Sequence, residues 1–242
     1  MSAPKRFFCN LINYPEESEV WLDGEEFTHA KTVLRITEGS EIVLLSGDGN
    51  EYSAIVTKVE KQRLSAHITG VMRGEREAAT PVCLLICALK GDKTEFVVQK
   101  ATELGVQRIG VFTSRYCSAY MNENKVERLR RVAREAAKQC LRSVAPTVDF
   151  FNDFKSALSS VDGFVNKLFF CEFASRSDAD LRDIKGSTAV VIGSEGGFSD
   201  EEFALAKSLG FSAMTLGKRI LRAETAAVAA CALTMFSLGE ME

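Results

Sequence analysis

Four charged residues lie in two glycine-bearing loops near the end of this 242-residue chain. Glu195 belongs to the first loop, and Arg219, Arg222 and Glu224 belong to the second. Carboxylates can accept a proton and guanidinium groups can stabilise an anion, so such a set could act on a bound ligand. Because a simple turn needs no charge, the set favours a ligand site over two structural turns.

The glycines of the two loops suit close approach by a ligand. Gly193, Gly196 and Gly197 lie in the first loop, and Gly217 lies in the second. Glycine adopts positive φ readily and has no Cβ to keep a ligand away from the backbone. A Gly-x-x-Gly-Gly pattern alone is typical of an ordinary turn, so the charged residues beside it carry the functional interpretation.

Each loop is expected to join a strand to a helix. Residues 189–192 form a β-branched apolar run typical of a strand buried on both faces, and Ser199 with Glu202 forms a helix capping box. The second unit repeats this order, with a strand at 213–216 and an alanine-rich helix at 224–238. The loops should therefore meet in a crevice at the carboxyl edge of a parallel sheet, where open α/β folds bind ligands.

Apolar strands and helices alternate from residue 82 onward. The expected strands are 82–89, 108–113, 147–151 and 168–171. One helix between them ends near residue 104, and two others span 123–141 and 154–161. This alternation predicts a doubly wound, mostly parallel α/β sheet, with right-handed and unknotted crossovers as the default.

Residues 1–72 have the pattern of a separate all-β domain. Short β-branched runs at 41–45, 52–59 and 64–71 suggest a small barrel, with one helix near 26–34. The polar, charged segment 73–81 has the composition of a linker, so the domain that follows should span 82–242.

Composition narrows the class of protein. Hydrophobic residues make up 46% and charged residues 26%, the net charge is −3, and no apolar run approaches the ~20 residues of a membrane span. No signal-peptide core is present, so a cytoplasmic location is expected. Seven scattered cysteines and two histidines argue against a disulfide framework and against a metal site.

The long helix expected at 123–141 is locally basic. Residues 125–142 carry seven basic and two acidic side chains, a local charge of +5 in a protein of net charge −3. Such a face is typical of phosphate binding. The alternative is a solvated helix stabilised by charge pairs between successive turns.

The two loop sequences identify a family resemblance. Residues 192–199 read Ile-Gly-Ser-Glu-Gly-Gly-Phe-Ser, and residues 216–226 read Leu-Gly-Lys-Arg-Ile-Leu-Arg-Ala-Glu-Thr-Ala. With Lys-Gly-Asp-Lys at 90–93 and Arg-Phe-Phe at 6–8, they closely resemble the RsmE family of bacterial 16S rRNA (uracil-N3)-methyltransferases, within the SPOUT superfamily. Ser194, Lys218 and Ala223 depart from the usual proline, proline and threonine, and losing two prolines predicts looser loops.

The resemblance implies a fold, a cofactor and a substrate. It implies a PUA-like β-barrel domain at 1–72, followed by a SPOUT α/β methyltransferase domain with a C-terminal trefoil knot. S-adenosylmethionine is the expected cofactor, and N3 of one uridine in the 16S rRNA of the small ribosomal subunit is the expected target. Two alternatives stay open: a SPOUT enzyme acting on a ribose 2′-hydroxyl or on tRNA, and a non-catalytic RNA-binding relative.

The resemblance also implies site residues. Glu195, Arg222 and Glu224 are the expected catalytic residues. Which of them is the base and which is an anchor stays open, and Glu195 could instead brace its loop. Cofactor contacts are expected from residues of the crevice: Cys171, Gly193, Glu195, Gly196, Gly197, Leu216, Gly217, Ile220, Leu221, Arg222 and Thr225. RNA contacts are expected from basic residues along the chain: Arg6, His29, Arg35, Lys90, Lys93, Arg130, Arg131, Arg134 and Arg142.

The last helix indicates how the chain could form an oligomer. Residues 225–238 are apolar on nearly every face, so this helix must be covered all round. Its own sheet covers one side, and a partner subunit could cover the rest, as the resemblance to dimeric SPOUT enzymes implies. A homodimer is therefore expected, unless the helix is central within one subunit.

Overall fold

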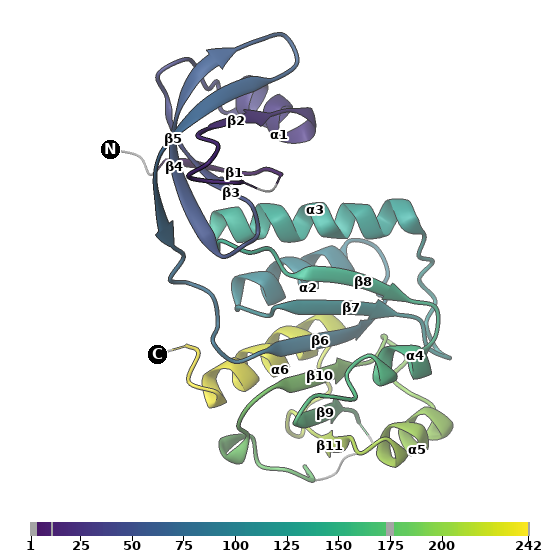
Figure 1. Cartoon of the computed structure of the whole chain (residues 1–242). Helices are drawn as coiled ribbons and strands as arrows, with labels where there is room; N and C mark the ends of the chain where they lie inside the picture. Colours follow the sequence, from purple (N-terminus) through teal and green to yellow (C-terminus); the bar gives the residue numbers. More distant parts are fainter. Residues whose placement is uncertain (1–3, 11, 173–176, 242) are drawn as a thin grey trace. The chain divides into compact units, whose positions relative to one another are not determined.

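A computed structural model describes residues 4–10, 12–172 and 177–241 of the chain (Figure 1). The chain divides into two compact units. The first comprises Met1–Glu77 together with Ala137–Ala145, and the second comprises Ala78–Ala136 together with Pro146–Glu242. That residues 137–145 group with the first unit was not predicted, because their hydrophobic pattern simply continues the preceding helix.

One five-stranded sheet forms the first unit. In sheet order its strands are β1 (Lys5–Phe8), β3 (Glu41–Leu45), β4 (Asn50–Val59), β5 (Leu64–Arg73) and β2 (Glu19–Leu22). Strands β1 and β3 pair in parallel, and the other neighbours pair antiparallel. Side chains alternate across each strand, which buries Ile42, Leu44, Ala54 and Val56 in the core of the unit. The three strands predicted between residues 41 and 71 are confirmed.

The short helix predicted at 26–34 is split in two. Helix α1 (Gly24–Thr28) continues directly into a π-helical turn, η1 (His29–Val33), where the Leu34 amide donates to the His29 carbonyl at 3.1 Å. Arg35 follows with a φ of +53°, a left-handed conformation that stops the helix.

Six parallel strands form the sheet of the second unit. They are β11 (Ser212–Met214), β9 (Asn166–Phe170), β10 (Thr188–Ile192), β6 (Val82–Cys87), β7 (Arg108–Phe112) and β8 (Thr147–Phe151). The central strands β6 and β10 are buried over their whole length, which explains their unbroken apolar sequences. The mixed α/β fold predicted for this part of the chain is confirmed.

Helices cover both faces of the six-stranded sheet. One face packs against α2 (Lys93–Glu103), α3 (Glu123–Gln139) and α6 (Ala223–Ser237). The other packs against α4 (Phe154–Ser159) and α5 (Asp200–Ser208) (Figure 1). Successive strand residues point to opposite faces, so β6, β7, β9 and β10 each contribute to both hydrophobic clusters.

Local signals set the ends of α5. Ser199 Oγ accepts the Glu202 amide at 3.3 Å, and the Glu202 carboxylate accepts the Ser199 amide at 2.9 Å. The predicted capping box is therefore confirmed. Gly210, with a φ of +81°, ends the helix as predicted.

Candidate functional site

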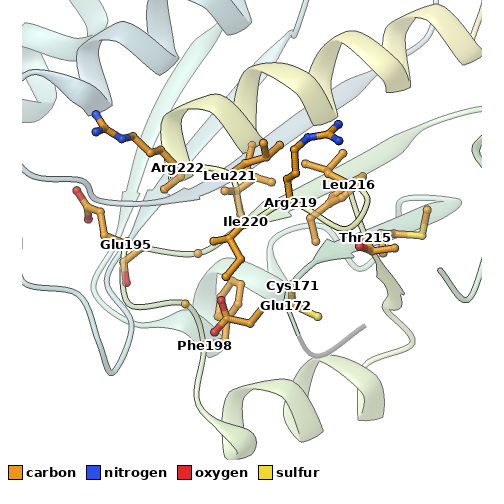
Figure 2. A pocket seen from close by; sticks show the side chains of 18 of the residues that line it. Cys171, Glu172, Glu195, Phe198, Thr215, Leu216, Arg219, Ile220, Leu221 and Arg222 are labelled. Atoms are coloured by element: carbon orange, nitrogen blue, oxygen red, sulfur yellow. The ribbon is translucent and has the colours of Figure 1, made fainter. Parts of the chain in front are cut away.

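A cavity of about 700 Å³ lies at the carboxyl edge of the parallel sheet (Figure 2). Its walls come from the ends of β9, β10 and β11, from most residues of the segments 170–172, 192–198 and 214–226, and from Lys93. The two glycine loops thus form the crevice that the sequence predicts. Because the six strands are parallel, their carboxyl ends lie at the same edge of the sheet, and loops that are distant in the sequence meet there.

The first loop is held by Ser194. Its buried hydroxyl donates to the Tyr116 carbonyl at 3.2 Å and accepts the Gly196 amide at 3.3 Å. The Gly197 amide donates to the Ser194 carbonyl at 3.0 Å. Hydrogen bonds of the Ser194 side chain tie the loop to residue 116, and looser loops on loss of the proline stay a prediction.

The glycines of the first loop serve packing within the protein. A Cβ on Gly193 would lie 2.8 Å from the Phe198 ring, and a Cβ on Gly196 would lie 2.8 Å from Tyr116 Cβ. Gly197 has a φ of +69°, and a Cβ there would meet the carboxylate of Glu172 at 2.6 Å. Gly193 and Gly197 also line the cavity, and Gly217 lines it from the second loop.

Most of the predicted cofactor residues come together in the walls of this cavity. Nine of them line it: Cys171, Gly193, Glu195, Gly197, Leu216, Gly217, Ile220, Leu221 and Arg222. Gly196 and Thr225 are not among the lining residues, so the cavity does not bring them to the expected contact. Gly196 packs on Tyr116, and Thr225 is exposed in the first turn of α6.

Glu195 and Glu224 share one lysine. Lys93 Nζ lies 3.1 Å from Glu195 Oε1 and 3.7 Å from Glu224 Oε2. Partial burial acts to raise the pKa of Glu195, but hydrogen bonds from backbone amides and from Lys93 outweigh it and hold the pKa below its usual value. Lys93 was expected to contact RNA, whereas the structure places it in the cavity wall between two of the predicted catalytic carboxylates.

The second loop presents two arginines. Arg219 and Arg222 both line the cavity and are exposed, with the almost fully exposed Ile220 between them (Figure 2). Within the described part of the chain, neither guanidinium makes a hydrogen bond or an ion pair. Both are therefore available to an anionic group that approaches the mouth of the cavity.

Sequence reasoning missed several cavity residues. Glu172 follows β9, and Phe170, Ile192 and Met214 are the last residues of three strands. The signal for Glu172 was present, because it adjoins Cys171 at the same strand end. The buried apolar residues carry no such signal, since any core strand has the same composition.

Two of the predicted RNA-binding arginines are internal. The Arg6 guanidinium forms a two-pronged ion pair with Glu51, at 2.7 and 2.9 Å, and its side chain is 8% exposed. Arg142 is 2% exposed, and its guanidinium donates to Glu77 at 2.9 Å. The expectation that these two residues present their charge to RNA is wrong, because burial and paired carboxylates neutralise them.

The basic helix is more fully paired than its composition suggests. Arg130 forms ion pairs with Glu123 and Glu127, and Arg128 pairs with Glu95 at 2.8 Å. Lys138 is buried and pairs with Glu26 at 3.0 Å. The local charge of +5 therefore overstates the free positive charge on α3, because Arg128 and Lys138 pair with carboxylates far away in the sequence.

The ion pairs described above do not decide the remaining predictions of RNA-binding residues. Arg35 and Lys90 are exposed and His29 is partly exposed, with its Nδ1 lacking a hydrogen bond in the described structure. Contact between RNA and these residues, or Arg131 and Arg134 of α3, stays a prediction.

Glu77 accepts five hydrogen bonds from the segment 142–144. Glu77→Ala is expected to lower the free energy of unfolding by about 3 kcal/mol, because it removes a carboxylate that pairs with the buried Arg142 guanidinium. Thermal and urea unfolding measure the loss. The control is Glu75→Ala, at an exposed neighbour, and equal stability of the two variants would contradict the structural role of Glu77.

No group of three or more His, Cys, Asp and Glu side chains that could hold a metal ion occurs among residues 4–10, 12–172 and 177–241. Over the same residues, no helix has both the length and the apolar character needed to cross a membrane. Burial raises the pKa of the Cys83, Cys87 and Cys231 thiols to about 12, so these three act as apolar core residues.

Family models match most of the chain. Residues 76–235 match an RNA methyltransferase domain, and residues 22–69 match an RNA methyltransferase PUA domain. The fold and the site thus define an RNA methyltransferase with a PUA domain before its α/β domain. Ribosomal RNA small subunit methyltransferase E of Mesomycoplasma hyopneumoniae is 33% identical over 92% of this chain and 95% of its own length. The same enzyme of Bacillus subtilis is 30% identical over 92% of each. The chain belongs to this ribosomal RNA small subunit methyltransferase E family.

Solved structures agree with this assignment over nearly the full length. A methyltransferase from Legionella pneumophila, solved with bound SAM, superimposes with a TM-score of 0.88 at 28% identity, covering 98% of each chain. A ribosomal RNA small subunit methyltransferase E from Neisseria gonorrhoeae, bound to S-adenosyl methionine, gives 0.86 at 29% identity, again over 98% of each chain.

Proposed function

We propose that the protein transfers a methyl group from S-adenosylmethionine to N3 of a specific uridine in the 16S rRNA of the small ribosomal subunit, in the cytoplasm. The observation that carries this proposal is the cavity between the two glycine loops. Those loops hold the sequence motifs of the family, and two relatives that match this chain over 98% of its length bind the same cofactor.

The residues of the cavity fit S-adenosylmethionine. A volume of about 700 Å³ is in the range of small-molecule sites. Glycine backbone at 193, 197 and 217 leaves room for hydrogen bonds to adenine, ribose and carboxylate groups, and Leu216, Ile220 and Leu221 supply apolar surface. When bound, the cofactor supplies an electrophilic methyl group.

The charged residues fit the acceptor. Uracil N3 carries a proton near neutral pH and is a poor nucleophile until that proton leaves. Glu195 and Glu224 supply carboxylates near the cavity, and Arg222 can stabilise the negative charge that develops on the ring oxygens. The uracil must be unpaired or flipped out of a helix to enter.

The proposal is tested by methylation of purified small ribosomal subunits and of naked 16S rRNA. Incubation with S-adenosylmethionine is expected to yield 3-methyluridine at one position, identified by mass spectrometry of nuclease fragments. A 2′-O-methylated product, or product formed only with tRNA, would replace the proposal with another RNA methyltransferase activity. Absence of thermal stabilisation by millimolar cofactor would favour the non-catalytic alternative.

The end of the chain is knotted in this proposal, as in other SPOUT enzymes. Helix α6 contacts β6 and β10, and it also contacts η2 (Leu181–Asp183), a short 3-10 helix in the connection from β9 to β10. A helix that touches both the sheet and an earlier connection supports passage of the chain beneath that connection.

The active form in this proposal is a homodimer. Ala227, Ala230 and Cys231 of α6 are buried against their own sheet, but Leu233 is 45% exposed and Phe236 is 65% exposed. Neighbouring turns of α6 place these two large apolar side chains close together. The second copy of the chain is the proposed cover, because α6 begins at the second loop of the cavity and a partner there would complete the site.

A further inference from the structure

Lys93 lies between two carboxylates that come from different loops. It is the first residue of α2, whereas Glu195 belongs to the loop after β10 and Glu224 belongs to the first turn of α6. The side chains of Lys93 and Glu195 are each 32% exposed, and that of Glu224 is 15% exposed. Partial burial weakens screening by salt, so one cation faces two anions at close range.

The two carboxylates are not held alike. Glu195 Oε1 accepts hydrogen bonds from Lys93 Nζ at 3.1 Å and from the Lys90 amide at 3.3 Å. Glu224 Oε2 is shielded from solvent and receives no hydrogen bond from the described part of the chain, since Lys93 Nζ stays 3.7 Å away. A buried polar atom without a partner destabilises a protein, so such an atom points to a functional use.

We propose that Lys93 is a positioning residue that holds Glu195 and Glu224 in place for two different roles. Glu195 anchors the first loop to α2, and the Glu224 carboxylate accepts the proton that leaves uracil N3. This inference rests on the proposed function. The N3–H bond breaks as an O–H bond forms on Glu224. The electron pair left on N3 forms the bond to the methyl carbon, while the carbon–sulfur bond breaks and leaves its electrons on sulfur.

The hydrogen bonds explain why Glu224, and not Glu195, takes the proton. Donors to a carboxylate stabilise its ionised form and use the lone pairs that a proton would need. Partial burial favours protonation of Glu195, but its donors prevail and hold its pKa below the usual value, so this carboxylate gives up its ionised form less readily than an ordinary glutamate. The Glu224 carboxylate receives no hydrogen bond from the described part of the chain, so donors of the protein do not occupy its lone pairs.

The test compares Glu224→Gln with Glu195→Gln. Single-turnover methylation of small ribosomal subunits gives the rate of methyl transfer, and calorimetry gives the affinity for S-adenosylmethionine. Glu224→Gln is expected to slow transfer by about 100-fold or more while cofactor affinity stays within about threefold. Glu195→Gln is expected to do the reverse, weakening cofactor binding about tenfold with a smaller effect on the rate at saturation.

Lys93 is tested with a matched pair of variants. Lys93→Met is expected to lower both the rate and the cofactor affinity, and Lys93→Arg is expected to restore both in large part, because it returns the charge. Thermal unfolding establishes that each variant is folded. A wild-type rate in Glu224→Gln, or wild-type behaviour in Lys93→Met, would overturn the inference. A wild-type protein that forms no 3-methyluridine would overturn the proposed function first, and this inference with it.

Discussion

Gly197→Val is expected to abolish binding of S-adenosylmethionine while the protein remains folded. Gly197 lines the cavity and has a φ of +69°, which a β-branched residue adopts only under strain. A Cβ there would also displace the Glu172 carboxylate, which lies 2.6 Å from its position. Calorimetry should show a loss of affinity of at least about 100-fold, or ~2.7 kcal/mol.

Gly210→Val is the matched control for this variant. Gly210 also has a positive φ, of +81°, but it follows α5, lies outside the cavity lining and has open space where a Cβ would project. Both variants should lose a similar amount of stability, about 1–3 kcal/mol. Only Gly197→Val should lose the cofactor, and near-normal affinity in that variant would contradict the placement of the cofactor in this loop.

Phe236→Glu is expected to turn a homodimer into an inactive monomer. Phe236 is 65% exposed on α6, and a carboxylate at the centre of an apolar interface would be desolvated without a partner. The wild-type protein should sediment at roughly twice the 26.6 kDa mass of one chain, and the variant at that mass. Because Phe236 is exposed in the single chain, its replacement should leave the monomer folded.

Val165→Glu is the control for the assembly experiment. Val165 is 72% exposed in the same unit but precedes β9, away from α6 in the sequence. This variant should sediment and methylate like the wild-type protein. A wild-type protein that sediments as a monomer, or a fully active monomeric Phe236→Glu, would rule out the homodimer.

Local sequence determined most of the secondary structure. The capping box of Ser199 and Glu202, the stop at Gly210 and the apolar runs of β6 and β10 act over a few neighbouring residues, so they can be recognised without the fold. The order of strands and helices then implied that both glycine loops lie at one edge of the sheet. The cavity there was predictable for that reason.

Tertiary structure decided what each charged side chain does. Lys93 and Glu195 are 102 residues apart in sequence, and Arg142 and Glu77 are 65 apart, yet each pair is in contact. Electrostatic energy depends on distance through space and on burial, and neither can be read from composition. A count of charges therefore predicted a free basic helix where the fold has paired Arg130 and Lys138. Only the fold showed that Lys93 lies between two carboxylates.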